Sequence, residues 1–521
     1  MNKQLVLLCF ICTLFACKTH QNLKTAASEP HRPKFHFTPQ ANWMNDPNGM
    51  VYYEGEYHLF YQYYPNATVW GPMHWGHAVS RDLVNWEHLP IALYPDSLGL
   101  IFSGSAVVDW NNSSGFGQNG KPPLVAIFTQ HSMEKEKAGR SDFQYQSLAY
   151  SNDKGRTWTK YKNNPIIPNT LKIRDFRDPK VVWDEDSKQW VMVFAAHDHI
   201  KIWTSKDLKN WQHQSDFGRE WGTHAGVWEC PDMFKIKVDG TGESKWVLLQ
   251  SLNPGSPNGG SGTQYLVGNF DGKNFTLDPS FASSVQNGNA VWLDYGRDNY
   301  AGVTWSDIPK KDGRRIFMGW MSNWDYATLV PTQAWRSAMT IPRSLNLQNT
   351  PNGLRLVSQP VQELKSLRKN TYTIESQVIN GLKDITTGTS LKDATIELEL
   401  QFEMPAAPVT QIGIQLSNAL GETYSIGYDL VRQAFLSDRS KSGKQAFSEK
   451  FGAKVDFAPR QSNDKFIRMH LFIDRASCEM FADEGTVVTT NIFFPTEDFN
   501  KVQLFSKGGA VTLISGNLYN L

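Results

Sequence analysis

Three acidic residues stand in short motifs whose neighbours suit chemistry on a sugar. Asp46 lies between an asparagine and a proline, Asp178 between an arginine and a proline, and Glu229 between a tryptophan and a cysteine. A nucleophilic carboxylate and a proton-donating carboxyl on either side of a glycosidic bond are the usual equipment for its hydrolysis. Taken singly, each acid is better explained as a turn cap or a satisfied ion pair. The three together favour a catalytic site, provided that the fold brings them into one place.

The neighbours of the three acids predict different tasks for them. The asparagine before Asp46, together with backbone donors, keeps that carboxylate ionised and suits it to nucleophilic attack. The tryptophan and cysteine around Glu229 offer an apolar setting, which favours a carboxyl that holds its proton. Asp178, beside its arginine, is expected to stay charged and to hold hydroxyl groups.

Apolar strands at regular intervals are the elements expected to position these acids. From Phe35 onward, alternating aromatic and β-branched runs are broken by Gly, Asn, Asp and Pro, which is typical of an all-β chain. Apolar strands recur roughly sixty residues apart, a spacing that fits four-stranded blades arranged around an axis. They are Tyr57–Gln62, Leu124–Gln130, Trp190–Ala196, Trp246–Ser251 and Ile316–Met321.

A recurring turn supports the same architecture. Ser80–Trp86, Ser151–Trp158 and Ser205–Trp211 each hold a serine, an aspartate two residues later and a closing tryptophan, and Asp271–Phe275 repeats the pattern more faintly. A β-sandwich would show shorter spacing without this repeat. The pattern therefore predicts a five-bladed β-propeller, whose innermost strands converge on the axis and bring acids of different blades together.

The character of the chain changes after Ile341–Arg343, since no tryptophan follows Trp335 and a polar, turn-rich stretch begins. We expect the propeller to cover residues 34–345, a linker to cover 346–356 and a C-terminal β-sandwich to cover 357–521. Strand-like segments continue through this last region, which holds no cluster of carboxylates that suggests a second site.

Composition is that of a soluble globular protein and excludes some classes of partner. Of the 521 residues, 40% are hydrophobic and 20% are charged, so the chain can bury a large core. The net charge of +1 gives no reason to expect nucleic acid as a partner. The 18 Trp and 18 Tyr point weakly to carbohydrate, because aromatic rings stack on the apolar faces of sugars. Nothing in the sequence specifies an oligomeric state.

The N-terminal stretch is interpreted as an export signal and a tether. Residues 1–17 have a basic start, an apolar run too short to span a bilayer, and an end that resembles a bacterial lipobox at Cys17. Lipidation of Cys17 predicts an enzyme or binding protein anchored in the cell envelope, with cleavage beside the bulky Phe15 and secretion as the alternative. Residues 18–33 are expected to be a flexible tether. No later segment is apolar enough to form a transmembrane helix.

The order and spacing of four motifs resemble glycoside hydrolase family 32, the invertases, levanases, inulinases and other β-fructosidases. The motifs are Trp43–Gly49, Phe102–Ser105, Arg177–Pro179 and Trp228–Pro231, and Asp474–Phe481 is similar to a strand of that family's C-terminal sandwich. The resemblance runs from about residue 34 to the C-terminus. It implies a five-bladed propeller followed by a β-sandwich, in agreement with the repeat, and hydrolysis of β-fructofuranosidic bonds.

Carried over position by position, the resemblance implies a role for each matching residue. The nucleophile falls on Asp46, the acid/base on Glu229 and the transition-state stabiliser on Asp178. The residues assigned to the terminal fructose pocket are Trp43, Asn45, Gln62, Trp70, Phe102, Ser103, Arg177 and Trp324. The family implies no cofactor and no metal, and His74 and His77 lack companions at ligand spacing.

The mechanism implied is double displacement with retention at C2 of a fructosyl unit, which requires the Asp46 and Glu229 carboxyls to lie about 5–5.5 Å apart. The motifs are more similar to those of exo-acting members, whereas the choice among levan, inulin and sucrose stays open. A non-catalytic fructan-binding lipoprotein and a fructosyltransferase that uses the same site remain as alternatives. A sialidase is disfavoured, because only its Asp-box turn is matched, at residues 151–158.

Overall fold

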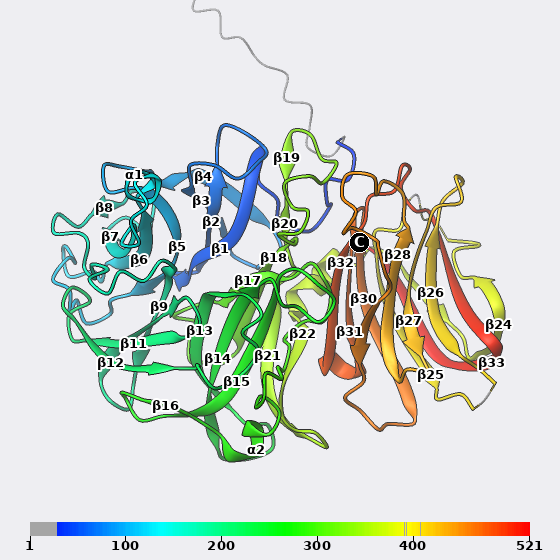
Figure 1. The fold of residues 1–521 in the computed structure, drawn as a ribbon. Helices are drawn as coiled ribbons and strands as arrows, with labels where there is room; N and C mark the ends of the chain where they lie inside the picture. Colours follow the sequence, from blue (N-terminus) through cyan, green and yellow to red (C-terminus); the bar gives the residue numbers. More distant parts are fainter. Residues whose placement is uncertain (1–28, 390, 392, 407) are drawn as a thin grey trace, which may run out of the picture.

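Two β-structured domains lie side by side in the computed structural model, which describes residues 29–389, 391, 393–406 and 408–521 (Figure 1). The first is a propeller of five sheets, and the second is a two-layered sandwich. Among the described residues, helix is limited to α1 (Met133–Lys137), α2 (Pro279–Ala282), η2 (Gln362–Leu367) and η3 (Asp483–Gly485). The predicted fold class, all-β with a five-bladed propeller followed by a sandwich, is confirmed.

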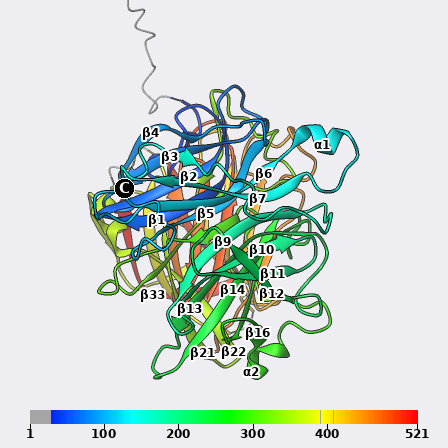
Figure 2. The ribbon, with the colours of Figure 1, turned by 90° about the vertical axis from the view of Figure 1, so that its left-hand side faces the viewer.

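The blades are antiparallel sheets whose innermost strands are neighbours around the propeller axis (Figure 2). The first blade comprises β1 (Asn42–Tyr53), β2 (Glu56–Tyr64), β3 (His74–Ser80) and β4 (Trp86–Leu93). The second comprises β5 (Leu100–Val108), β6 (Leu124–His131), β7 (Gln144–Ser151) and β8 (Thr159–Lys160). The third comprises β9 (Phe176–Asp184), β10 (Gln189–Ala196), β11 (Ile200–Ser205) and β12 (Trp211–Phe217).

The remaining two blades complete the ring. The fourth comprises β13 (Val227–Lys237), β14 (Ser244–Asn253), β15 (Gly262–Phe270) and β16 (Phe275–Leu277). The fifth comprises β17 (Tyr300–Thr304), β18 (Arg315–Met321), β21 (Arg343–Thr350) and β22 (Gly353–Pro360), and the short β20 (Ala338–Met339) also pairs with β18. The apolar strands predicted from the sequence are the second strands of the five blades, namely β2, β6, β10, β14 and β18.

The repeated Ser-x-Asp turns join the third and fourth strands of their blades. In the first of them, Asp82 Oδ1 accepts hydrogen bonds from the backbone N–H groups of Val84 and Asn85, at 3.0 and 2.7 Å. Asp207 accepts the equivalent pair in the third blade. A short acidic side chain that caps two backbone donors lets the chain reverse direction without unpaired polar groups.

The segment between β18 and β21 closes the ring of blades. Its strand β19 (Trp335–Arg336) pairs in parallel with β1 of the first blade. Asn42 N–H donates to Ala334 O at 2.8 Å on one side of this pairing. The fifth and first blades are therefore joined by backbone hydrogen bonds, and β1 is not left as an open sheet edge.

The predicted boundary between the domains is wrong. Residues 346–356, expected to be a linker, lie in β21 and β22, which pair with each other as the outer hairpin of the fifth blade. β21 also pairs with β18. The outer strands of a blade face solvent on one side, so they carry polar residues that resemble a linker in the sequence. The connector is Val361–Asn370, which includes η2, and the sandwich begins at β23 (Thr371–Ile374) rather than at residue 357.

The sandwich has two layers that share one long strand, β33 (Lys501–Asn520). One layer runs from β29 through β28 and β27 to β26, which pairs with the first half of β33. The other runs from β32 through β31 and β30 to β25, which pairs with the second half of β33. The strands besides β23 and β33 are β24 (Gln377–Asp384), β25 (Ile396–Glu403), β26 (Gln411–Ser417), β27 (Thr423–Asp429), β28 (Ala434–Lys441), β29 (Asp456–Pro459), β30 (Phe466–Asp474), β31 (Ser477–Ala482) and β32 (Val487–Ile492).

Strands β31 and β32 lie at the contact between the two domains. Every residue of both strands is buried, so neither shows the alternation of a strand with one solvent face. Arg343 is fully buried here and bonds to Asp294 at 2.8 Å and to Glu479. His36 bridges Asp474 Oδ2 and Glu479 Oε1, at 2.8 and 2.9 Å. The domains are therefore joined by a buried ionic network as well as by apolar packing.

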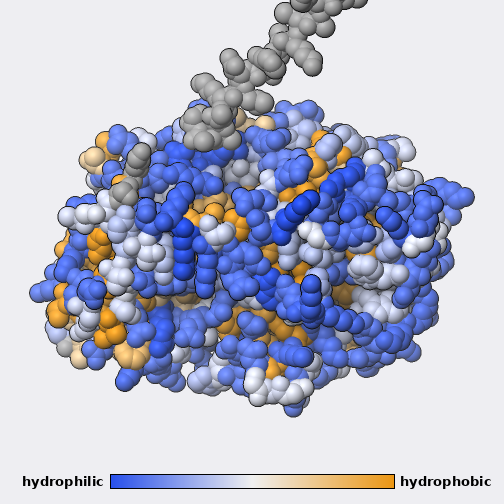
Figure 3. Space-filling view, turned by 180° about the vertical axis from the view of Figure 1, so that it is seen from behind, coloured by the Kyte–Doolittle hydropathy of each residue, from blue (hydrophilic) through white to orange (hydrophobic). Residues whose placement is uncertain are grey.

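Apolar residues are largely withdrawn from the surface. The face seen in Figure 3 is mainly hydrophilic, with apolar residues in separate small patches. Five tryptophans, Trp43, Trp75, Trp228, Trp305 and Trp320, are among the largest fully buried side chains. Much of the high tryptophan content thus serves the core.

The N-terminal segment is docked where the structure describes it. Residues 1–28, with the predicted signal and Cys17, lie outside the described residues. The tether predicted for residues 18–33 is wrong over residues 29–33, because Arg32 is buried and donates to Thr38 Oγ1 and Pro39 O at 3.0 and 2.8 Å. No helix in the described part of the chain is long and apolar enough to cross a membrane.

Replacing His36 with glutamine is expected to destabilise the protein in a pH-dependent way. Burial opposes the charged ring, but hydrogen bonds to Asp474 and Glu479 and their charges outweigh it and raise the pKa of His36 to about 9. The stabilisation is therefore fully present below the ordinary pKa of 6.5 and is lost as pH rises through about 9. We expect His36→Gln to lower the free energy of unfolding by about 3–5 kcal/mol at pH 6, as for a broken buried pair.

Urea unfolding at pH 6 and at pH 10 measures this effect, with the more exposed His213 replaced by glutamine as the control. The loss caused by His36→Gln should shrink at the higher pH. An equal loss at both pH values would contradict the charged bridge.

Candidate active site

A β-bulge interrupts the innermost strand of every blade near the same end of the propeller axis. The pairing register shifts between Met44 and Pro47 in β1, Ile101 and Gly104 in β5, Arg177 and Lys180 in β9, Glu229 and Asp232 in β13, and Tyr300 and Val303 in β17. A bulge re-aims side chains that would otherwise follow the alternation of the strand. The predicted acids lie at three of these bulges, and Ser103 lies at a fourth.

Asp46 is held by donors from three directions. Asn45 Nδ2 donates to its Oδ1 at 3.0 Å, and Ser103 Oγ donates to its Oδ2 at 2.7 Å. The Cys230 thiol approaches the same Oδ2 at 3.5 Å. Burial raises the pKa of Asp46, the bonds from Ser103 and Asn45 lower it, and the charge of Glu229 raises it. The net shift is upward, so the donors favour the ionised carboxylate but only partly offset burial.

Asp178 does not have the close ion pair that its sequence neighbour suggests. Arg177 Nε lies 3.8 Å from Asp178 Oδ2, whereas the backbone N–H of Cys230 donates to that oxygen at 3.0 Å. Burial raises the pKa of Asp178 to about 7, against the lowering by Arg177, and the charges of Glu229 and Asp46 add to the rise. The close pairing with Arg177 that the sequence suggests is absent, and the effect of burial outweighs the charge of Arg177.

Glu229 has polar rather than apolar contacts. Arg177 Nη2 donates to Glu229 Oε1 at 2.9 Å, and the Tyr300 hydroxyl donates to Oε2. Trp228 instead packs in the core, stacked on His224 with ring centroids 4.8 Å apart. Successive side chains of a strand point to opposite faces, so the sequence neighbour of Glu229 is not its spatial neighbour. The predicted apolar setting is wrong.

Arg177 connects the acids of the site. Besides Glu229, it bonds to Asp175 Oδ1 at 2.6 Å and to Gln144 Oε1 at 3.3 Å through Nη1. Asp175 also contacts His197 Nδ1 at 2.9 Å. The guanidinium is thus fixed by two elements and faces Glu229 from a defined direction.

Trp43 and Asn45 position Asp46. Trp43 is fully buried, and its Nε1 donates to Asn45 Oδ1 at 2.7 Å, which orients the amide toward Asp46. Trp43 therefore acts on the site through Asn45 instead of offering a surface to a ligand. Trp324, half-buried, stacks on Trp43 with centroids 5.9 Å apart, so its position depends on the same ring.

The other predicted pocket residues lie around this centre. Trp70 is 38% exposed, and its ring meets Phe102 edge-on at 6.1 Å. Phe102 in turn stacks on His131 at 4.4 Å. Gln62 of β2 is buried, and its Nε2 has no hydrogen-bond partner among the described residues. An unpartnered buried amide donor in such a place is available to a ligand.

Sequence reasoning missed Tyr300, Asp175 and the central position of Cys230. The Cys230 sulfur lies 3.5 Å from an oxygen of Asp46 and 3.6 Å from an oxygen of Asp178, so one thiol joins two carboxylates. Tyr300 opens β17, in the same place as the acids of the other innermost strands. Aligning the five innermost strands would have drawn attention to it.

The propeller axis is closed beyond the site. Lys180 Nζ lies 3.2 Å from Asp232 Oδ2 and donates to Thr304 O at 2.5 Å. Thr304 donates to the same Asp232 oxygen through its backbone N–H and its hydroxyl, at 2.6 and 2.8 Å. These residues come from β9, β13 and β17 and are buried. This axial plug separates the site from the opposite end of the propeller.

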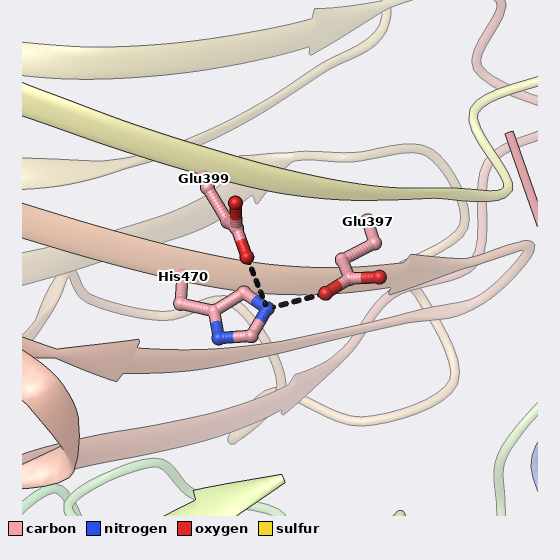
Figure 4. A group of neighbouring side chains, drawn as sticks. All are labelled: Glu397, Glu399 and His470. Atoms are coloured by element: carbon pink, nitrogen blue, oxygen red, sulfur yellow. Dashed lines mark hydrogen bonds and ion pairs between the residues drawn. The ribbon is translucent and has the colours of Figure 1, made fainter. Parts of the chain in front are cut away.

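A second group of titratable side chains lies in the sandwich, at Glu397, Glu399 and His470 (Figure 4). His470 Nε2 lies 2.6 Å from Glu397 and 3.9 Å from Glu399. The guanidinium of Arg368 donates to both oxygens of Glu397 and reaches Glu399 at 3.2 Å. The carboxylate and imidazole atoms of these residues could hold a metal ion. Because the carboxylates already face the guanidinium of Arg368, we interpret the group as an ion-pair network.

Comparisons with known proteins agree with this geometry. The model of the glycosyl hydrolases family 32 N-terminal domain matches residues 36–360, and that of the family's C-terminal domain matches residues 363–520. The chain belongs to glycosyl hydrolase family 32. The break between the two models falls at the connector seen in the structure and not at the predicted linker.

Relatives and solved structures cover the whole fold. A levanase of Bacillus subtilis is 48% identical over 494 residues, which cover 95% of this chain and 71% of the relative. An extracellular exo-inulinase of Aspergillus niger is 40% identical, and the match covers 95% of this chain and 95% of the relative. The crystal structure of an exo-inulinase from Aspergillus awamori aligns with a TM-score of 0.86 at 37% identity, covering 95% of this chain and 99% of that one.

The Cys230 thiol of this family 32 member is expected to be unreactive in the folded protein. Burial raises its pKa well above the ordinary value, and the charges of Asp178 and Asp46 add to this. Alkylation requires the thiolate, so iodoacetamide at pH 8 should leave the Cys230 peptide unlabelled in native buffer and label it in guanidinium chloride. Peptide mass spectrometry measures this, and native labelling at the rate of an exposed thiol would refute the assigned environment.

Proposed function

We propose that this family 32 hydrolase is a retaining β-fructofuranosidase that releases fructose from fructans, with Asp46 as nucleophile and Glu229 as acid/base. The observation that carries the proposal is the convergence of these two carboxyls from β1 and β13 with different partners. Asp46 is surrounded by donors that favour its ionised form. Glu229 retains an exposed side-chain fraction of 21%, so it can meet a departing group. The names of the levanase and exo-inulinase relatives support fructan as the substrate.

In the first step, an oxygen of Asp46 attacks C2 of a terminal fructosyl unit while the bond to the leaving oxygen breaks. Glu229 gives its proton to that oxygen, and a covalent fructosyl-enzyme forms. In the second step Glu229 takes a proton from water, whose oxygen attacks C2 and releases Asp46. Two inversions return the original anomeric configuration.

Arg177, Tyr300 and Asp178 support these steps. Arg177 and Tyr300 each hold one oxygen of Glu229, which fixes the direction in which its proton is delivered. Asp178, anchored by the Cys230 N–H, is placed to accept hydrogen bonds from sugar hydroxyls, as a transition-state stabiliser. The free Nε2 of Gln62 and the exposed ring of Trp70 complete a pocket for a polar ring with an apolar face.

Replacing Asp46 with asparagine is expected to lower kcat on levan or inulin by roughly four orders of magnitude, as for loss of a catalytic carboxylate. The fold should be retained, because asparagine has nearly the same shape, and thermal unfolding checks this. With methanol as acceptor, the unmodified protein should form methyl β-fructofuranoside. An α product would refute retention, and equal fructose release by both forms would refute the assigned nucleophile.

Removing the Ser103 hydroxyl is expected to shift the acid limb of the pH profile of kcat/KM upward. The bond from Ser103 lowers the pKa of Asp46, so Ser103→Ala raises it, and the nucleophile is protonated at a higher pH than before. A lost hydrogen bond to a charged group predicts a decrease of roughly tenfold or more on the acid side.

Ser105→Ala is the matched control, because this buried hydroxyl on the same strand donates to Pro179 O and not to Asp46. Identical pH profiles for the two variants would argue against the role of Ser103.

A fructosyltransferase would share the covalent intermediate, and a binding lipoprotein would lack catalysis. Product analysis on levan, inulin and sucrose separates these activities: free fructose from the start supports exo-hydrolysis, longer fructosyl products support transfer, and no product supports binding alone. The same comparison gives the preferred fructan.

We also propose that the protein is anchored to the cell envelope through a lipid on Cys17, with secretion as the alternative. The support is the apolar run and lipobox-like end of residues 1–17. Cys17→Ala should move the protein from the membrane fraction to the soluble fraction.

A further inference from the structure

A second cavity opens at the end of the propeller away from the candidate active site. Its volume is about 680 Å³, which is within the usual range for small-molecule sites. Its walls come from the far ends of β5, β9 and β13 and from the loop after β17. The residues used below are Trp110, Trp183, Phe234, Ser306, Asp307 and Arg315.

This cavity is distinct from the active site. The innermost strands run from the bulges that carry the acids to the cavity, and the axial plug of Lys180, Asp232 and Thr304 lies between. A ligand in the cavity therefore contacts none of the residues assigned to catalysis. The kind of ligand that fits the cavity therefore follows from the residues that line it.

Two tryptophans give the cavity fixed aromatic surfaces. Trp110 is 58% exposed, yet its Nε1 donates to Asp307 Oδ1 at 2.8 Å and its ring contacts Tyr53 at 5.8 Å. Trp183 packs edge-on against Trp190 at 5.1 Å. A large aromatic ring that is held in place and left open to solvent is typical of a binding surface, since it loses little conformational entropy when a ligand stacks on it.

The polar groups of the cavity are only partly satisfied. Ser306 Oγ is buried and has no hydrogen-bond partner among the described residues. Arg315 lies with its guanidinium 4.9 Å from the centre of the Phe234 ring, and its hydrogen bond to Trp305 O is long, at 3.5 Å. Donors and an unpaired hydroxyl thus face a space bordered by aromatic rings.

The charges at the rim exclude a strongly charged ligand. Lys235 pairs with Asp186 at 2.6 Å, and Lys310 pairs with Glu185 at 3.1 Å. The whole lining is nearly balanced, so a polyanion or a cation is not strongly attracted; its charged residues are Asp184, Glu185, Asp186, Asp307, Lys235, Lys310 and Arg315. Aromatic surfaces with scattered donors and acceptors, and with little net charge, match a neutral ligand rich in hydroxyl groups.

We propose that this cavity is a second carbohydrate-binding site, which holds an internal segment of a β-fructan while chain ends are hydrolysed at Asp46 and Glu229. The identity of the sugar rests on the proposed function. Trp110 and Trp183 stack on sugar faces, while Arg315, Ser306 and Asp307 bond hydroxyl groups. The site retains the enzyme on a polymer and has no contact with a substrate as short as sucrose.

The test uses the full chain with Trp110→Ala, and with Arg315→Met as a second variant that keeps an unbranched apolar stem and removes the guanidinium. Leu420→Ala, at a residue 55% exposed on the sandwich, is the matched control. Retardation by levan and by inulin in native gels is measured in the Asp46→Asn background, so that hydrolysis does not remove the polymer. KM is measured for both polymers and for sucrose in the active background, and thermal unfolding confirms that each variant is folded.

We expect both cavity variants to weaken polymer retention by roughly tenfold, the size of one lost aromatic or charge-assisted contact. KM for the polymer should rise by a similar factor, with kcat and the sucrose parameters unchanged. The Leu420 variant should behave as the unmodified protein. Unchanged retention in both folded cavity variants, or equal changes for polymer and sucrose, would overturn the proposal.

A different observation would refute the proposed function. The unmodified protein would then release no fructose from levan, inulin or sucrose. If fructose is released normally but the polymer is retained equally by all variants, the second site is refuted and the proposed function is not. Retention of another neutral polysaccharide in place of levan and inulin also refutes the second site as stated.

Discussion

The crowding of three carboxyls at the propeller axis is the constraint on which the site depends. Asp46, Asp178 and Glu229 reach one buried region from different blades, where negative charges are poorly screened from one another. Arg177 supplies one positive charge, and it lies closer to Glu229 than to Asp178. The balance is provided by short-range donors, such as Ser103 at Asp46 and the Cys230 N–H at Asp178. Protonation in this site is thus a property of the whole group.

The architecture was predictable because it is repeated. Each blade contributes an apolar second strand, and several blades share an aspartate turn such as that at Asp82. The agreement between these copies is what predicts a propeller. The acids were predictable because their motifs are distinctive. Tyr300 was not predicted, because no motif surrounds it; its position becomes informative only when the five innermost strands are aligned, and its contact with Glu229 forms where β17 meets β13. The setting of Glu229 was misjudged because strand neighbours point to opposite faces.

The domain boundary was also difficult to predict from the sequence. Polar residues in β21 and β22 look like a linker, but they form the solvent-facing hairpin of a blade. Conversely, Asp474 of β30 and Glu479 of β31 are charged residues that are fully buried against His36 and Arg343. Such ionic groups are tolerated only because both domains contribute partners, so a sandwich separated from its propeller would leave several charges buried without a counter-ion or exposed on an apolar face.

The axial plug restricts how substrate enters the site and how product leaves it. Because Lys180, Asp232 and Thr304 fill the axis on one side of the three acids, a molecule reaches these acids from the other end of the propeller. A molecule therefore does not pass along the axis from the site to the opposite end of the propeller. For the proposed hydrolysis, substrate entry and product release then use the same end of the propeller, and a polymer held close to the enzyme is available sooner for the next cut.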